Sequence, residues 1–387
     1  MPRSLTFEID ERIAYDGSII EALSESSVLR VIECLRERKV EAVAVCLLWS
    51  VSNPAHERRV GELLAQHLPG IAVTLSSELN PVMREYRRAS AATIDASLKP
   101  LITRYIADLS TQLEQRGFRG QVRILTSLGG LKGAEEASAA PIQLLKSGPS
   151  TAPVAGRHYG STVETGKDRD LIITDSGGTT YDVSLVRNGE ITRSRDTWIG
   201  PELMGHPTGF PSVDVKSIGA GGGSIAWVDS GGVLHVGPQS QGADPGPACY
   251  GRGGAEATVS DAALVLGYLD PDYFLGGRMR LDRQASIDAV RGRVAEPLGL
   301  DVDAAASAII AVATENMAGA IFDLTVEKGV DPARAVLVGG GGAAGLNTVF
   351  IARRLRCASV IFPEVGAALS AGGAVLSDLY GDRKSVV

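Results

Sequence analysis

Residues 171–182, with the sequence LIITDSGGTTYD, combine groups that can contact phosphate. An apolar run ends at Asp175, and the chain then turns through Gly177-Gly178, where no side chain shields the backbone N–H groups. Thr179 and Thr180 add hydroxyl donors. Such a turn lets phosphate oxygens approach the backbone closely. The two glycines and two threonines are therefore predicted to bind a nucleotide.

Two aspartates, Asp175 and Asp182, flank the turn and are the predicted catalytic residues. A carboxylate beside a phosphate repels it unless a divalent cation lies between them. Either aspartate is thus a candidate for Mg²⁺ through water, and we assign the metal to Asp175. The alternative is a hairpin in which Asp and Gly serve only the turn. Short motifs also occur by chance, so the motif alone leaves both interpretations open.

A second glycine run, Gly339–Gly342, lies between a predicted strand at 333–339 and a predicted helix at 345–355. A further strand at 358–363 completes a βαβ unit, so part of the sheet must be parallel. The sugar or phosphate of a nucleotide can rest against such a loop and the helix N-terminus that follows it. Gly339, Gly340, Gly341 and Gly342 are predicted to bind the nucleotide, with close helix–strand packing as the alternative.

The elements that must position these turns alternate between helices and strands, which predicts an α/β fold. Apolar spacing and end signals predict helices at 27–40, 56–68, 84–116 and 303–329, and strands at 41–49, 71–77, 121–127, 171–175 and 181–192. The last two strands form a hairpin around the first glycine turn. Helix 303–329 has Asp303 as its predicted N-cap and Gly329 at its C-terminus.

Glycine is concentrated in residues 209–254, which hold a large share of the 46 glycines in the chain. Apolar residues alternate at 224–228 and 233–237 within this segment, which predicts short strands there. We therefore expect ordered loops and hairpins rather than a disordered linker.

Composition excludes several classes of function. The chain has 387 residues, a length typical of two or three domains, and a net charge of −7 with no basic blocks, which argues against nucleic-acid and membrane partners. Its four cysteines form no CxxC pair, which argues against a zinc site or a disulfide framework and fits a reducing cytosol. The sequence shows neither a signal peptide nor an uncharged apolar run of about 18 residues, so a cytoplasmic location is expected.

Several segments together resemble the hydantoinase/oxoprolinase family. They are EYRRASAATIDASLKPLI, SGPS, DSGGTTYDVSLV, VGGGGAAG, ALSAGGAVLSD and the long block SIGAGGGSIAWVDSGGVLHVGPQSQGADPGPACYGRGGAEATVSDAALVLG. They occur in the order of that family and span nearly the whole chain. The resemblance is to the A-type subunit, in the branch that includes N-methylhydantoinase A, 5-oxoprolinase and the acetone carboxylase beta subunit.

The resemblance implies ATP-binding lobes of the actin/sugar kinase/Hsp70 type (ribonuclease H-like), with DSGGTTYD as the second of two phosphate-binding hairpins. It implies ATP and Mg²⁺ as cofactors and ATP-dependent hydrolysis of a cyclic amide such as 5-oxoproline or a hydantoin. Phosphorylating an amide oxygen makes the amide open to attack by water, so the protein mainly positions groups and stabilises charge. A B-type subunit or a homo-oligomer is the implied assembly. An ATP-dependent ketone carboxylase subunit and a non-catalytic, partner-binding remnant are the alternatives.

The chain departs from the family pattern at three places. Full-length members begin with another Asp-Gly-Gly-Thr hairpin and continue into a further C-terminal domain, and neither is found in this sequence, so the lobes are expected to be incomplete. The family assignment divides the chain into a remainder of the N-terminal domain at 1–80 and a hydantoinase A domain at 81–387, itself split into 81–165 and 166–387. In the late loop the family commonly has His where this chain has Asn347.

Five further residues have more ordinary predicted roles. His56 is expected to be a solvated or capping residue, and Arg87 and Arg88 to lie on a solvated helix face. Cys249 has no neighbouring base in sequence and is expected to pack in the interior. Asp261 is expected to cap the helix that it precedes.

Overall fold

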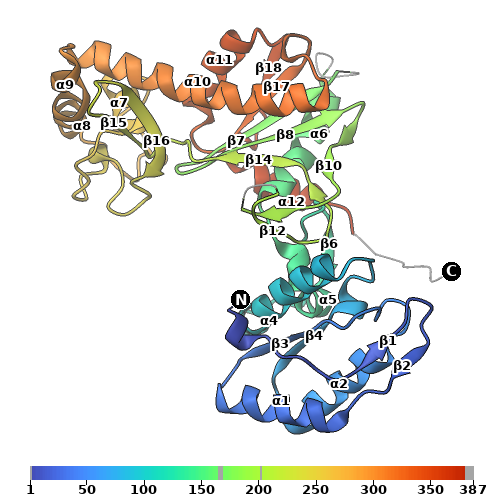
Figure 1. Cartoon of the computed structure of the whole chain (residues 1–387). Coiled ribbons are helices and arrows are strands. Elements are labelled where there is room, and N and C mark those ends of the chain that lie inside the picture. Colours follow the sequence, from blue (N-terminus) through green and yellow to red (C-terminus); the bar gives the residue numbers. More distant parts are fainter. Residues whose placement is uncertain (1, 164–168, 201–202, 380–387) are drawn as a thin grey trace. The chain divides into compact units, whose positions relative to one another are not determined.

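The computed structural model of the chain describes residues 2–163, 169–200 and 203–379 (Figure 1). It divides into two compact units. Unit 1 consists of Met1–Ser147, Arg193–Ser212 and Asp378–Val387, and unit 2 of Gly148–Thr192 and Val213–Ser377. Both glycine turns lie in unit 2. The predicted family segments 1–80, 81–165 and 166–387 are not the same division and stay a prediction.

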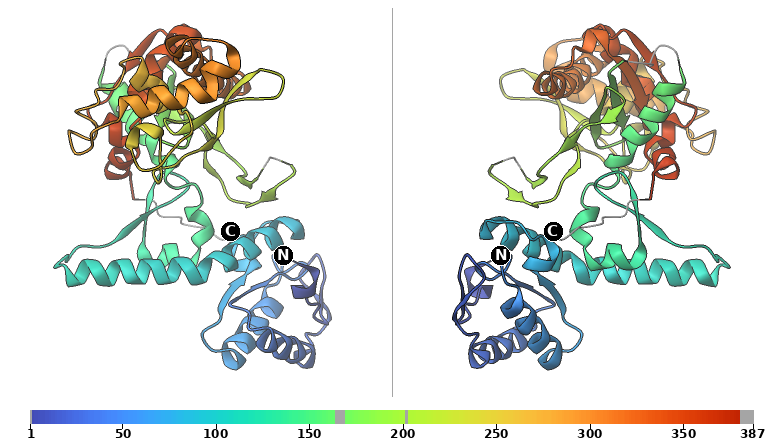
Figure 2. Two further views of the ribbon diagram at one scale, coloured as in Figure 1. Left: turned by 90° about the vertical axis from the view of Figure 1, so that its left-hand side faces the viewer. Right: turned by 90° about the vertical axis from the view of Figure 1, so that its right-hand side faces the viewer.

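Unit 1 contains the α–β–α arrangement that the sequence predicts. Its main elements are α1 (Glu25–Glu37), β3 (Ala42–Val45), α2 (Ala55–His67), β4 (Ala72–Leu75) and α4 (Glu85–Gln115). Ser24 caps α1 by accepting a hydrogen bond from the N–H of Ser27. Strands β3 and β4 are parallel. Helix α4, seen from the side in Figure 2, continues through Pro100 as predicted.

The remaining elements of unit 1 are short. They are β1 (Arg12–Ile13), β2 (Ile19–Glu21), α3 (Ser76–Leu79), β5 (Arg123–Leu125), β6 (Leu131–Gly133), α5 (Ala134–Ala139), β10 (Arg193–Ser194), β11 (Trp198–Ile199), β12 (His206–Pro207) and two 3₁₀ turns at Arg3–Leu5 and Pro141–Leu144. Strand β5 is shorter than the predicted strand at 121–127. The chain begins to turn at Thr126, whose N–H donates to the carbonyl of Gly130 at 2.9 Å.

Unit 2 is built on a six-stranded sheet in the order β14-β8-β7-β17-β18, with β9 paired to β8. The strands are β7 (Leu171–Ser176), β8 (Tyr181–Arg187), β9 (Glu190–Ile191), β14 (Val215–Ile218), β17 (Val336–Gly340) and β18 (Ser359–Ile361). Strands β7 and β8 form the predicted antiparallel hairpin. Strand β17 runs parallel to both β7 and β18, and α11 (Ala344–Leu355) connects β17 to β18, so the predicted βαβ unit is confirmed.

Helices cover both faces of this sheet, and the mixed α/β class is confirmed. On one face Ile172 and Val183 pack with Met317 of α10 (Val302–Lys328) and with α11. On the other face Ile173 and Val338 pack with α6 (Ala152–Thr162) and α12 (Leu369–Leu376). Because successive residues of a strand point to opposite faces, neighbouring residues of β7 reach different helix layers.

Helix α10 is the longest helix of unit 2. Its N-cap is Asp301, not the predicted Asp303, because the side chain of Asp301 accepts from the N–H of Ala304; Gly329 ends it in the left-handed region as predicted. The helix is long and apolar enough by composition to cross a membrane. Twelve of its residues are buried against the rest of unit 2, which accounts for its apolar composition as that of a core helix.

Two predictions about strands have different outcomes. The predicted strand at 181–192 is wrong in its second half: β8 ends at Arg187, and Asn188 and Gly189 turn the chain with φ values of 51° and 78°. An Asn-Gly pair favours such a tight turn, because both residues tolerate positive φ. The glycine-rich segment 209–254 is ordered, as predicted. It contains β13 (Ser212–Val213), β14, β15 (Ser224–Val228) and β16 (Leu234–Ser240).

Strands β15 and β16 form a separate antiparallel pair in unit 2 (Figure 1). Ala226 and Val236 of this pair belong to a buried apolar cluster that also contains residues of α7 (Val259–Val265), α8 (Arg283–Val290) and the first half of α10. The pair is therefore held by a core of its own, next to the six-stranded sheet.

Candidate functional site

The turn between β7 and β8 presents free backbone donors. The N–H of Gly177 donates to the carbonyl of Thr180 at 2.9 Å and closes the turn. Gly178, Thr179 and Thr180 are exposed, and within the described residues the N–H groups of Gly178 and Thr179 have no hydrogen-bond acceptor. The structure therefore brings together the four turn residues that were predicted to bind a nucleotide, with unused donors at their centre.

The glycine loop at residues 221–223 holds this turn by backbone hydrogen bonds. The N–H of Gly222 donates to the carbonyl of Gly177 at 3.1 Å, and that of Gly223 to the carbonyl of Gly178 at 2.6 Å. A Cβ atom on Gly221 would lie 2.6 Å from the carbonyl oxygen of Gly177. Residues 221–223 were not predicted as part of the site. Their glycine clustering was the available signal, because only glycine allows two backbones to approach so closely.

Asp175 lies on the face of the sheet that α6 and α12 cover. The hydroxyl of Ser370 in α12 donates to Oδ2 of Asp175 at 2.6 Å. Asp182 is the residue of β8 directly opposite Asp175. Two carboxylates in facing positions repel each other, and a bound cation relieves that repulsion. The facing pair therefore suits a divalent cation.

The cation that this pair fits is one held largely by water and phosphate. In the described parts of the chain, no group of three or more His, Cys, Asp and Glu side chains could hold a metal by itself. Mg²⁺ commonly takes only one or two carboxylates from the protein and completes its shell with water and substrate phosphates. Asp175 and Asp182 beside a phosphate-binding turn match that requirement.

Ser176 faces the opposite helix layer. Asn347 of α11 is 4% exposed, and its side-chain amide donates to the hydroxyl of Ser176 at 2.8 Å. Its side-chain oxygen is buried, and within the described residues it has no hydrogen-bond partner. Asn347, the residue that stands where the family commonly has His, thus connects α11 to the end of β7 and keeps one buried acceptor.

The four glycines of the second run have two different roles. A Cβ atom on Gly339 would lie 2.6 Å from the side chain of Thr348, and one on Gly340 would lie 2.4 Å from that of Leu369. These two glycines are buried in β17 and allow close packing of α11 and α12 against the sheet. Packing, the alternative interpretation, therefore describes them better than nucleotide contact.

Gly341 and Gly342 lie beyond the end of β17. Gly341 has a φ of 91°, and a Cβ atom there would lie 2.3 Å from the carbonyl oxygen of Ser176. Gly342 is exposed, with no atom within 4 Å of its Cβ position. Helix α11 begins immediately after them, and its N-cap residue, Ala343, makes no side-chain cap. The N–H groups of Ala343, Ala344 and Leu346 donate to carbonyl oxygens, so in the described part of the chain the N-terminus of α11 offers an anion the N–H of Gly345 and the positive end of the helix dipole.

The two turns lie at the same end of the sheet, where β7 and β17 have their carboxyl ends. Strands β7 and β17 are parallel neighbours, and Gly340 pairs in register with Asp175. Ligands of open α/β sheets bind at the carboxyl ends of such strands. Free backbone donors, an uncapped helix N-terminus and a facing pair of carboxylates make this end of the sheet suited to a polyphosphate with its divalent cation.

Asp261 and Cys249 lie away from the carboxyl ends of β7 and β17 and have structural roles. The carboxylate of Asp261 is fully buried and accepts hydrogen bonds from the N–H groups of Ala248, Cys249 and Thr258 and from the hydroxyls of Thr258 and Ser286. Asp261 is the third residue of α7, and Thr258 is the N-cap, so the cap is a reciprocal capping box. Cys249 is buried as predicted, and burial raises its pKa well above the ordinary range.

Two predictions for unit 1 are wrong. His56 is not solvated: its ring lies 2.7 Å from a carboxylate oxygen of Glu11, and both side chains are buried. Arg88 is fully buried and donates to the carbonyl of Leu47 at 2.7 Å. Arg87, by contrast, lies near the surface and pairs with Asp196. Single-sequence spacing placed both arginines on one exposed face, because it does not show that a loop folds over Arg88.

Comparison with known families gives two matches that together span most of the chain. The family described as Hydantoinase/oxoprolinase matches residues 88–383. The family described as Hydantoinase/oxoprolinase N-terminal region matches residues 1–68.

Comparison with individual proteins gives relatives that are longer than this chain. The chain is 40% identical over 383 residues to the caprolactamase subunit alpha of Pseudomonas jessenii, which covers 99% of this chain and 54% of the relative. It is 30% identical over 384 residues to the acetone carboxylase beta subunit of Xanthobacter autotrophicus, covering 98% and 52%. The chain thus spans about half the length of these relatives.

A solved structure shares the fold. The crystal structure of the ATP-dependent caprolactamase from Pseudomonas jessenii superposes with a TM-score of 0.84 at 39% identity, over 98% of this chain and 54% of that one.

Proposed function

The chain belongs to the hydantoinase/oxoprolinase family. From this premise we propose that unit 2 binds ATP with Mg²⁺. We further propose that the chain serves ATP-dependent hydrolysis of a cyclic amide, as an A-type subunit or part of one. The observation that carries the proposal is the arrangement of backbone donors at the carboxyl ends of β7 and β17. There, the N–H groups of Gly178 and Thr179 have no acceptor among the described residues, and the start of α11 is joined to the end of β7 because the N–H of Ala343 donates to the carbonyl of Ser176 at 2.9 Å. Two of the relatives are named for ATP-dependent reactions.

The actin-like character of the nucleotide lobe is part of the same proposal. The β7–β8 hairpin, the parallel β17 and the helices on both faces of the sheet are consistent with it. In this assignment the β7–β8 turn holds the terminal phosphates. The loop at Gly341-Gly342 and the N-terminus of α11 lie toward the nucleoside.

The residues of unit 2 supply positioning and charge stabilisation. Bound ATP would supply a phosphoryl group to the amide oxygen, which activates the amide carbon for attack by water; the ring C–N bond then breaks, the nitrogen leaves as the amine, and ADP and inorganic phosphate are the other products. The N–H groups of Gly178 and Thr179 neutralise phosphate charge without a side chain that must reorganise. Asp175, held by Ser370 at 2.6 Å, and Asp182 would hold Mg²⁺ through water. The mechanism needs no side-chain nucleophile, which agrees with the buried, protonated thiol of Cys249.

Calorimetric titration with Mg·ATP tests the nucleotide assignment. We expect a binding heat for the wild-type chain and at least a tenfold weaker affinity for Asp175→Asn and Gly178→Val. The matched controls are Asp272→Asn, an exposed aspartate elsewhere in unit 2, and Gly292→Val, because Gly292 also has no atom within 4 Å of its Cβ position. Equal heats from all five proteins would remove the β7–β8 turn from the nucleotide site.

An amide assay tests the reaction class. Ring opening of 5-oxoproline, hydantoins and lactams is measured with and without ATP, using the chain together with a co-expressed B-type subunit. We expect product only when ATP is present, and an ATP-independent rate would refute the mechanism. Incorporation of carbonate into a ketone would favour the carboxylase alternative, which the relative named acetone carboxylase beta subunit supports.

A cytoplasmic location and an assembly with a B-type subunit or with further copies complete the proposal.

A partner-binding role without catalysis is the second candidate. It is favoured by Asn347, which stands where the family commonly has His and makes only a structural contact to Ser176 among the described residues. Asn347→His separates the two roles. A gain of ATP-dependent turnover would assign catalysis to the family's usual side chain, and unchanged nucleotide binding without turnover in both proteins would favour the partner-binding role.

A further inference from the structure

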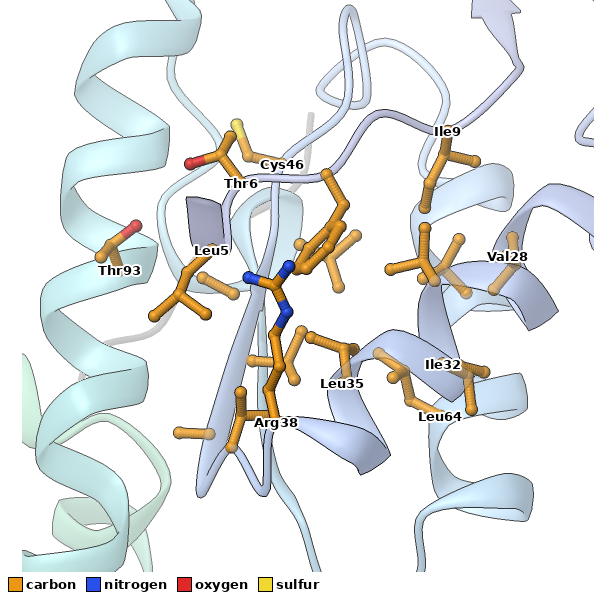
Figure 3. A pocket seen from close by; sticks show the side chains of 18 of the residues that line it. Leu5, Thr6, Ile9, Val28, Ile32, Leu35, Arg38, Cys46, Leu64 and Thr93 are labelled. Carbon is orange, nitrogen blue, oxygen red and sulfur yellow. The ribbon is translucent and has the colours of Figure 1, made fainter. Parts of the chain in front are cut away.

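An apolar cavity of about 660 Å³ lies in unit 1. Figure 3 shows the side chains of α1, and Thr93 of α4, projecting from the two helices that border it. Arg38 and Glu41 are the charged residues of its lining, and the guanidinium of Arg38 already lies 5.4 Å from the ring centroid of Phe7 and donates to the carbonyl of Ser4. Because precisely placed polar groups give a pocket its specificity, these apolar walls do not indicate a particular ligand.

A polar contact in unit 2 is more specific, because it fixes one oxygen of Asp175 and not the other. The hydroxyl of Ser370 donates to Oδ2 of Asp175 at 2.6 Å, a length typical of a strong hydrogen bond from a hydroxyl to a carboxylate. Oδ1 accepts no hydrogen bond from the described residues. It faces the loop that follows β17, since a Cβ atom on Gly341 would lie 2.5 Å from it. The carboxylate therefore presents Oδ1 to the carboxyl ends of β7 and β17.

Ser370 is itself held in place by close packing. It is the second residue of α12, and its carbonyl accepts from the hydroxyl of Thr151 at 2.8 Å. The preceding residue, Leu369, is buried, and a Cβ atom on Gly340 of β17 would lie 2.4 Å from its side chain. A Cβ atom on Gly373, three residues after Ser370, would lie 1.9 Å from the carbonyl oxygen of Thr151. The first turn of α12 thus has little room to move, and the hydroxyl of Ser370 stays on the carboxylate.

Mg²⁺ and Ca²⁺ use carboxylates differently. Mg²⁺ demands a near-ideal octahedral shell, keeps several waters and takes few oxygens from the protein, whereas Ca²⁺ accepts more oxygens in a flexible geometry and can bind both oxygens of one carboxylate. A hydroxyl that is hydrogen-bonded to Oδ2 competes with coordination through both oxygens. Asp175 is therefore arranged for a cation that needs only Oδ1, directly or through water.

We propose that Ser370 determines the cation preference of the nucleotide site: its hydroxyl occupies Oδ2 of Asp175 and leaves Oδ1 for the cation, which favours Mg²⁺ over Ca²⁺. Ser370 acts through Asp175 and is a positioning residue. The inference rests on the proposed function, because it requires the nucleotide and its cation to bind at the carboxyl ends of β7 and β17. Groups that orient a metal ligand commonly contribute roughly ten- to hundredfold to metal affinity. Loss of the hydroxyl should therefore weaken Mg²⁺ binding and open both oxygens to Ca²⁺.

Calorimetric titration of the whole chain with Mg·ATP and with Ca·ATP tests this role. We expect Ser370→Ala to weaken Mg·ATP binding by about tenfold or more and to leave Ca·ATP binding within about threefold of the wild type, so that the ratio of the two dissociation constants changes. Ser370→Thr keeps the hydroxyl and should retain the wild-type ratio. Ser377→Ala is the matched control, because the hydroxyl of Ser377 at the end of α12 donates to the carbonyl of Gly373 at 2.8 Å. Neither affinity should change in this control.

An Asp175→Asn background separates positioning from packing. Because Ser370 acts through the carboxylate, adding Ser370→Ala to Asp175→Asn should not change the ratio further. If urea unfolding shows that Ser370→Ala is unstable, Ser370→Cys, whose thiol is a weak donor of similar size, replaces it and should shift the ratio in the same direction. Equal weakening of Mg·ATP and Ca·ATP binding, or no change in either, would overturn this inference alone. A wild-type chain that binds neither complex would overturn the proposed function and this inference with it.

Discussion

At the scale of single residues, Gly341 has the most restricted position in the candidate site. Its φ of 91° is unfavourable for any side chain, and a Cβ atom would lie 2.3 Å from the carbonyl oxygen of Ser176. We expect Gly341→Ala to destabilise unit 2 by about 2 kcal/mol or more and to weaken Mg·ATP binding. Gly342→Ala is the control, because its Cβ position is open and it should unfold like the wild type. Urea denaturation measures both, and equal losses of stability would contradict the close approach of β7 and β17.

A substitution at Asp261 tests whether its buried carboxylate, which lies in the long glycine-rich segment that resembles the family, has a structural role. Its oxygens accept three backbone N–H groups and two hydroxyls, and no part of it is exposed. Asp261→Ala leaves those donors unsatisfied and should cost about 3 kcal/mol or more. Asp282→Ala, which removes only the side-chain cap of α8, should cost about 1 kcal/mol. Thermal unfolding distinguishes these values, and a fully stable Asp261→Ala variant that had lost activity would instead assign Asp261 to catalysis.

Asp95 makes the stability of unit 1 depend on pH. Burial raises the pKa of its carboxyl above the ordinary 3.8, although the N–H of Ile142, the hydroxyl of Thr74 and the ammonium of Lys99 act in the opposite direction. The folded state therefore binds this proton more tightly than the unfolded state. The contribution of Asp95 to stability is fully present below pH 3.8 and is lost as pH rises through the higher folded pKa.

Urea unfolding of the wild type and of Asp95→Asn between about pH 3.5 and 7 measures this contribution of Asp95 to stability. The stability of the wild type relative to the variant should fall as pH rises. A difference that grows with pH would mean that the hydrogen bonds from Thr74 and Ile142 outweigh the burial of the carboxylate.

The residues that sequence reasoning placed well are those that belong to a local pattern. The order Asp175, glycine turn, threonines needs only a strand end and a tight turn, and the structure has both. His56 and Arg88 were placed wrongly, because their partners Glu11 and Leu47 lie 45 and 41 residues away in sequence. Loop 221–223 was missed as a support of the β7–β8 turn for the same reason.

At the scale of elements, two glycines in helices have opposite effects on stability. Gly156 of α6 lies against β7, and a Cβ atom there would lie 2.4 Å from Cδ1 of Ile173. Gly319 in the middle of α10 is exposed and has no atom within 4 Å of its Cβ position. Gly156→Ala should destabilise the chain by about 1–3 kcal/mol, and Gly319→Ala should stabilise it by about 0.5–1 kcal/mol. A melting temperature of Gly156→Ala that rises together with that of Gly319→Ala would show that α6 can move away from the sheet, and a lowered melting temperature of Gly319→Ala would contradict the prediction for α10.

Long helices and the parallel βαβ unit could be predicted from the sequence, because their apolar residues recur over many turns or form continuous buried strands. Helix α4 was predicted within one residue at each end, although Pro100 lies inside it. Strands of two or three residues, such as β9 and β11, contain too few residues for alternation to be detected. The end of β8 was missed because Val186 and Arg187 continue the alternation up to the turn at Asn188.

At the scale of the whole molecule, unit 1 includes residues that follow the first segment of unit 2. Residues 193–212 belong to unit 1, where Asp196 pairs with Arg87, and the carbonyl of Pro207 accepts from the hydroxyl of Ser90 at 2.7 Å. The predicted division into 81–165 and 166–387 does not contain this return of the chain to unit 1, because the return depends on contacts with α4 and not on local composition. Unit 2 is consequently discontinuous in sequence, although its six-stranded sheet includes strands from both of its segments.

That discontinuity makes the independence of unit 2 testable. The ends of segment 193–212 meet, since the N–H of Asp214 donates to the carbonyl of Thr192 at 2.9 Å. A chain of residues 148–377 in which a linker of about four Gly and Ser residues replaces 193–212 can therefore close without strain. Because β7, β17, α11 and the Gly221–Gly223 loop all lie within it, we expect this protein to unfold cooperatively and to bind Mg·ATP within threefold of the affinity of the full chain. Cooperative unfolding together with loss of binding would show that the nucleotide site requires residues of unit 1, and the assignment of phosphate binding to the carboxyl ends of β7 and β17 alone would then be wrong.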